Sequence, residues 1–125
     1  MWLLTTGELD AGCDRARRFY SSARDLNYPI IFKAVMGLGH ADSPVADRLG
    51  VCFFEYALAE KTKRDAANAD DVAKSQPLDL TAFNLSPYYG DLMNQDMFAA
   101  EQKEMIPAGF LVPLPNKDIA DAWNK

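Results

Sequence analysis

The fold is decided by residues 30–35, which have the sequence Ile-Ile-Phe-Lys-Ala-Val and follow Pro29. β-Branched and aromatic residues in an almost continuous apolar run are typical of a buried strand. A second run of this kind, Trp2 to Thr6, starts almost at the first residue. Since no turn, cap or polar lead-in precedes it, we expect this strand to lie inside a larger domain, with Met1 not the natural start.

Each predicted strand is followed by a predicted helix. Beyond the turn residues 7–12, apolar side chains recur every three or four positions, at Ala16, Phe19, Tyr20, Ala23 and Leu26. Ser43 and Pro44 are typical N-cap and first-turn residues of a second helix. Its apolar face comprises Val45, Leu49, Cys52, Phe53, Tyr56 and Ala57. The order strand, helix, strand, helix predicts an α/β fold with a partial parallel sheet, right-handed crossovers and both faces covered.

Three segments are expected along the chain. Residues 1–62 form the strand–helix–strand–helix part, and residues 63–76 form a polar, alanine-rich connector. Residues 77–125 are expected to be an irregular tail that wraps against the core, with one helical stretch near Gln95 to Met105. Prolines punctuate this tail at Pro77, Pro87, Pro107, Pro113 and Pro115.

Composition limits the classes of partner. The 125 residues are 49% hydrophobic and 11% aromatic, which favours a globular core. A formal net charge of −5 and a pI near 4.7 argue against binding to nucleic acid or to an anionic membrane. We expect no signal peptide and no membrane-spanning segment, because the apolar run at residues 2–4 is far too short. Two cysteines, Cys13 and Cys52, are too few for a disulfide framework and lack metal-ligand spacing.

Asp10 and His40 are the candidate catalytic pair. Each lies in the loop directly after the carboxyl end of a predicted strand, where ligands and catalytic groups gather in open parallel sheets. If the strands are neighbours, the carboxylate can accept the imidazole Nδ1–H and leave Nε2 free as a general base. The alternative is that Asp10 caps the following helix and His40 is an ordinary loop residue.

The segments Gly7-Glu8-Leu9-Asp10 and Gly37-Leu38-Gly39-His40 resemble two turns of the α/β-hydrolases. In that family a Gly-x-x-Asp segment after the penultimate strand carries the triad acid, and a Gly-x-Gly-His or Gly-x-x-His turn after the last strand carries the histidine. The family order of nucleophile, acid and histidine also agrees. Over residues 2 to about 60, the resemblance implies an esterase-like or lipase-like serine hydrolase that acts on a small-molecule ester without a cofactor.

The family's nucleophile motif, Gly-x-Ser-x-Gly, occurs nowhere in the sequence. The serines that lack flanking glycines are Ser21, Ser22, Ser43, Ser75 and Ser86. The resemblance therefore implies that the serine belongs to upstream sequence and that this chain alone is inactive. Cys13, at the start of a predicted helix, is an alternative thiol nucleophile, but it follows Asp10, so we expect a small packed residue there.

Two other kinds of site fit the residues poorly. Gly7 to Asp14 has P-loop glycine spacing but no Lys or Ser/Thr at the required positions, and a metal site from Glu8, Asp10 and His40 has no recognised spacing. The alternative to a hydrolase is a non-catalytic module. Such a module would bind a partner or self-associate into a homo-oligomer through the incomplete sheet.

Overall fold

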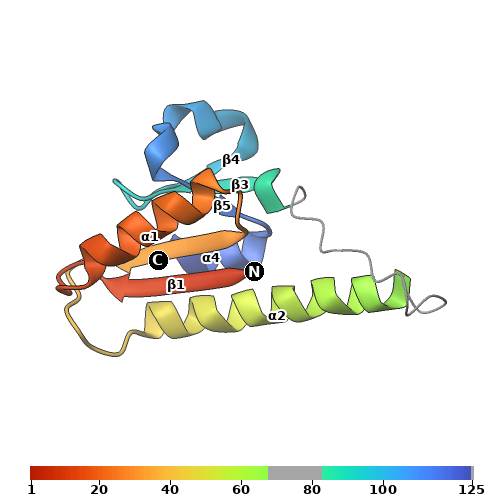
Figure 1. Ribbon diagram of the computed structural model, residues 1–125, viewed down its shortest axis with the longest axis horizontal. Coiled ribbons are helices and arrows are strands. Elements are labelled where there is room, and N and C mark those ends of the chain that lie inside the picture. The colour runs from red at the N-terminus through yellow and green to blue at the C-terminus, as the bar shows by residue number, and fades with distance from the viewer. Residues whose placement is uncertain (68–82, 125) are drawn as a thin grey trace.

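The computed structural model describes residues 1–67 and 83–124, and two parallel strands lie at its centre (Figure 1). Strand β1, Trp2–Gly7, pairs with β2, Ile30–Val35, in a parallel register that joins Trp2 to Ile30 and Gly7 to Val35. The prediction of parallel strands is confirmed, and the two strands are direct neighbours. Both loops that carry the candidate residues therefore leave the same edge of the sheet.

The predicted helices follow these strands. Helix α1, Cys13–Asp25, connects β1 to β2 and packs on one face of the sheet, where the rings of Tyr20 and Phe32 stack at 5.6 Å. Helix α2, Pro44–Ala67, follows β2. The Ser43 Oγ accepts a hydrogen bond of 3.3 Å from the Ala46 N–H and caps α2 as expected.

Helix α2 extends into the segment that was predicted to be a connector. Residues 63–67 belong to its C-terminal end, because Lys63, Arg64 and the two alanines that follow Asp65 are good helix formers that need no buried face. The remaining connector residues 68–76, and residues 77–82 of the predicted tail, lie outside the described residues.

The prediction of an irregular tail is wrong for residues 83–124, which contain a second sheet and a helix. Strands β3, Tyr88–Asp91, β4, Met97–Ala99, and β5, Leu111–Leu114, form an antiparallel sheet in the order β4-β3-β5. The 3₁₀ helices η2, Ala100–Met105, and η3, Ala108–Phe110, precede β5, and helix α4, Lys117–Trp123, follows it.

Two local features explain why the sequence pattern of this region did not predict its strands and its 3₁₀ helix. Pro113 lies inside β5, but among the described strands β5 pairs with β3 alone, so the missing N–H costs no ladder bond. The helical stretch expected near Gln95 to Met105 is a turn, the short β4 and the 3₁₀ helix η2. Such brief elements show no measurable periodicity.

The C-terminal segment covers the outer edge of β2. The Trp123 side chain is fully buried, and its Nε1–H donates a hydrogen bond of 2.8 Å to the Phe32 carbonyl. On the other face, the Tyr20 hydroxyl donates 2.7 Å to the Leu111 carbonyl. The shared core draws on both halves of the chain, including Tyr20, Ile30, Ile31, Phe32, Leu49, Val112, Leu114, Ile119 and Trp123. In the described part of the chain this leaves β1 with the open edge.

The open edge of β1 presents polar backbone groups, and exposed apolar side chains of the neighbouring helix lie near it. The N–H groups of Trp2 and Glu8 donate to Pro29 and Val35 at 2.9 Å, so the alternate residues of β1, Leu3 and Thr5, direct their backbone groups to the other side. No described strand pairs there.

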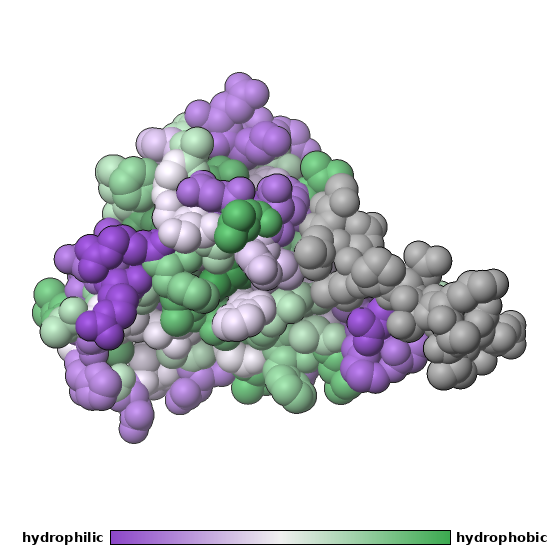
Figure 2. All heavy atoms as spheres, viewed as in Figure 1, coloured by the Kyte–Doolittle hydropathy of each residue, from purple (hydrophilic) through white to green (hydrophobic). Residues whose placement is uncertain are grey.

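Helix α2 runs beside β1 (Figure 1). It has apolar side chains on its outer face as well as on its inner one. Val51, Phe54 and Leu58 are 58%, 72% and 56% exposed, and their spacing places them on one face. Figure 2 shows hydrophobic residues at the surface along the border where α2 lies. Among the described helices, none is long and apolar enough to cross a membrane.

Candidate active site

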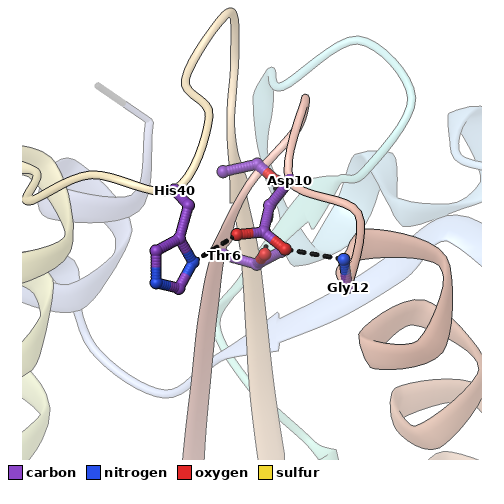
Figure 3. A network of polar contacts seen from close by, with 5 residues as sticks. Thr6, Asp10, Gly12 and His40 are labelled. Carbon is purple, nitrogen blue, oxygen red and sulfur yellow. Dashed lines mark hydrogen bonds and ion pairs between the residues drawn. The ribbon is translucent and has the colours of Figure 1, made fainter.

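The structure brings Asp10 and His40 into direct contact. The Asp10 Oδ2 and the His40 Nδ1 are 2.6 Å apart, although the residues are thirty positions apart in the sequence. Asp10 follows β1 and His40 follows β2, so the contact joins the carboxyl ends of the two parallel strands (Figure 3). The site therefore has the arrangement of a carboxylate that orients an imidazole.

The environment of Asp10 favours its charged form. Its Oδ1 accepts a hydrogen bond of 2.6 Å from the Gly12 N–H, while Oδ2 faces His40. The Gly12 N–H, and after it the hydrogen bond from His40, hold the pKa of Asp10 below its usual value. An ionised carboxylate can only accept, so the proton in the Asp10–His40 bond belongs to Nδ1. Asp10 thus both closes the turn before α1 and fixes the His40 tautomer.

Close packing of the two loops brings Asp10 and His40 within contact distance. The Leu9 N–H donates 2.8 Å to the Leu38 carbonyl, which extends the pairing beyond the strands. A Cβ on Gly7 would lie 2.2 Å from the Gly39 carbonyl oxygen, a distance that no side chain tolerates. Gly37 has a φ of +67°, which glycine adopts without strain. The glycines of the two motifs therefore serve to bring the loops together.

The two members of the pair differ in exposure. The His40 side chain is 98% exposed, whereas that of Asp10 is 18% exposed. In Figure 3 the second ring nitrogen of His40 points away from Asp10. Both residues border an open hollow of about 690 Å³ between the strand ends and the start of α2; its lining also includes Thr5, Thr6, Gly7, Leu38, Asp42, Ser43 and Asp47. Nε2 is accordingly free to exchange a proton with a group that enters from outside.

In the described residues, no serine or cysteine side chain is placed to act as a nucleophile beside His40. Ser43 lines the hollow, but it is buried and its Oγ caps α2. Ser86 is buried and donates to the Phe83 carbonyl. Cys13 is 4% exposed within the hydrophobic core, as expected for a small packed residue. Ser75 lies outside the described residues.

The geometry of this site does not support the alternative that Glu8, Asp10 and His40 bind a metal ion. The Glu8 carboxylate accepts a hydrogen bond of 3.0 Å from the Gly37 N–H. Within residues 1–67 and 83–124, no group of three or more His, Cys, Asp or Glu side chains converges to hold an ion.

Lys33 is a residue whose buried location could not be predicted from the sequence. It is 3% exposed; its Nζ donates 2.7 Å to Gln95 Oε1 and lies 4.4 Å from the centre of the Trp123 ring. Burial lowers the pKa of Lys33 to about 8. A single lysine inside an otherwise apolar strand was the available signal, but its partners come from the C-terminal segment.

Comparisons with models of protein families, with curated proteins and with solved structures found no match to this chain.

Proposed function

We propose that Asp10 and His40 are the acid and the base of a Ser-His-Asp triad in a hydrolase of carboxylic esters, with the nucleophilic serine in upstream sequence. The observation that carries the proposal is the 2.6 Å contact between Asp10 Oδ2 and His40 Nδ1. It joins the only histidine of the chain to a carboxylate whose pKa is lowered. A surface ion pair would need neither the close-packed loops nor the shared strand edge.

The geometry supports defined roles for the two residues in an ester hydrolysis. Nε2 of His40 would take the proton of the serine hydroxyl as the oxygen attacks the ester carbonyl, and would pass it to the departing alcohol. Asp10 would stabilise the imidazolium formed in between. In the second half, Nε2 would take a proton from water as the water oxygen attacks the acyl-enzyme, and would return it to the serine as the acid leaves.

The open edge of β1 supports a position for the missing nucleophile. The far edge of β2 is covered by Trp123 and β5, whereas no strand of residues 1–67 or 83–124 pairs with the backbone of Leu3 and Thr5 on the open side of β1. A further parallel strand added beside β1 would end at the same edge of the sheet as Asp10 and His40. A serine after such a strand would lie at the edge of the sheet that borders the hollow.

The proposal is tested with the longest natural reading frame that contains these residues. We expect an in-frame extension of about 150–250 residues with a strand–Gly-x-Ser-x-Gly–helix segment. The protein made from it should hydrolyse p-nitrophenyl esters and react with a fluorophosphonate at that serine. His40→Ala should lower kcat/KM by about 10²–10⁴-fold, and Asp10→Asn by up to about 10⁴-fold.

Asp25→Asn is the matched control, because Asp25 is exposed at the far end of α1. It should leave both turnover and labelling unchanged. Labelling that proceeds at the same rate in His40→Ala, or a reading frame that stops just before Met1, would contradict the proposal.

A non-catalytic, self-associating module is the second candidate. Two features favour it: the edge of β1, with which no described strand pairs, and the exposed outer face of α2 with Val51, Phe54 and Leu58. Such an edge is a template for pairing with another chain. Sedimentation should then show a dimer of the 125-residue chain that Phe54→Glu disrupts. Leu85→Glu should not, although Leu85 is as exposed as Phe54. A monomer at all concentrations would remove this candidate.

A further inference from the structure

We propose that Glu8 is a positioning residue that holds the loop 37–40 so that His40 meets Asp10. The inference rests on the proposed acid–base role of that pair. Glu8 has no bond to His40; its Oε2 accepts a hydrogen bond of 3.0 Å from the Gly37 N–H. It therefore acts on the loop rather than on the imidazole.

Glu8 and Asp10 hold opposite ends of the same loop. Glu8 binds Gly37, where the chain leaves β2, and Asp10 binds His40, where the loop ends. Leu9, between them, donates its N–H to the Leu38 carbonyl and keeps its side chain 70% exposed. Both carboxylates thus come from the turn after β1 and bind the loop after β2.

Backbone contacts hold Leu38 and Gly39 against the turn after β1, whereas little packing surrounds His40 at the end of the loop. Nothing lies within 4 Å of the position that a side chain would take at Gly37 or Gly39, although the Gly39 carbonyl lies close against Gly7. The His40 side chain is almost fully exposed, and packing contributes little to its orientation. Whether the His40 Nδ1 reaches Asp10 consequently depends on the position of the loop backbone. Glu8 fixes the first residue of that loop, Gly37.

Removal of the Glu8 carboxylate leaves the Gly37 N–H without its protein acceptor. The loop gains freedom at its first residue, and the fraction of molecules in which His40 meets Asp10 falls. Because Asp10 fixes the proton on Nδ1, a released imidazole changes its tautomer. Glutamine keeps a carbonyl oxygen at the same position and should preserve most of the contact.

The experiment uses ¹⁵N-histidine labelling of the 125-residue chain, in which His40 is the only histidine, so each ring nitrogen gives one signal. Spectra are recorded at a pH where the ring is neutral. We expect mainly the Nδ1–H tautomer in the unaltered chain and in Glu8→Gln. Glu8→Ala should lose the majority of that form, approaching Asp10→Asn. Leu9→Ala, in the same turn, is the control that should change nothing.

The outcomes separate the two proposals. If Glu8→Ala keeps the Nδ1–H tautomer while Asp10→Asn loses it, the pair exists and Glu8 does not position it. If Asp10→Asn has no effect either, the Asp10–His40 contact itself is absent, and the proposed function falls with it. Should Glu8→Ala fail to fold, loss of the tautomer in a folded Glu8→Gln would equally count against the inference, since glutamine retains the acceptor.

Discussion

The Trp123 indole nitrogen donates a 2.8 Å hydrogen bond to the Phe32 carbonyl, which lies 91 positions earlier in the chain. The ring is fully buried between β2 and β3. Trp123→Ala would leave a cavity and an unpaired carbonyl, and should lower the free energy of unfolding by about 3–5 kcal/mol. Urea unfolding measures this. Trp2→Ala is the control: Trp2 is 57% exposed, and its loss should cost about 1 kcal/mol or less.

Gly90 and Gly50 should respond in opposite directions to alanine. A Cβ on Gly90 would lie 2.6 Å from the Trp123 ring, whereas nothing lies within 4 Å of a Cβ on Gly50 inside α2. Gly90→Ala should therefore destabilise by about 1–3 kcal/mol through overpacking. Gly50→Ala should stabilise by about 0.5–1 kcal/mol through helix propensity. Thermal unfolding compares them, and equal shifts would contradict the contact at Gly90.

Lys33 should make stability rise with pH above neutrality. Its folded pKa is lowered to about 8, so above that value the unfolded state binds more protons than the folded state, and the free energy of unfolding increases with pH. We expect a rise between pH 8 and 10 that Lys33→Met abolishes. The exposed Lys103 is the control, and Lys103→Met should keep the rise. Beyond pH 10, Tyr20 acts in the opposite direction, because burial raises its pKa.

Asp10 should contribute to the loss of stability in acid. Its folded pKa is lowered by the Gly12 N–H and by His40, so its contribution is present above the unfolded value of about 3.9 and disappears as the pH falls through the folded value. Asp10→Asn should unfold more easily than the unaltered chain at pH 6, and the difference should shrink as the pH falls below the unfolded value. A constant difference across this range would show that the carboxylate charge is not involved.

The strand–helix part of the fold could be predicted because its signals are long and local. The second strand begins and ends where residues 30–35 indicated, and the cap at Ser43 places the start of α2. Asp10 and His40 followed from the rule that parallel strands end at one edge. Their contact needed no knowledge of side-chain packing, since the neighbouring strands fix the distance between the loops.

The second sheet could not be predicted in the same way. Its strands are three or four residues long, and long-range pairing rather than local pattern defines them. The role of Trp123 depends on Gly90 and Phe32, which belong to different elements. The contact from Glu8 to Gly37 was hidden for a related reason: a glutamate in a turn is ordinarily solvated, and only the tertiary structure supplies its donor.

The position of Trp123 in the chain also determines when the protein can mature during synthesis. The central strand β2 is made early, but the ring that covers its edge and lies over Lys33 comes from residue 123. Until that residue has left the ribosome, β2 has an apolar edge open to solvent. Strand edges that stay exposed in this way promote aggregation. A growing chain should therefore depend on chaperone protection of β2 until residue 123 can pack against it.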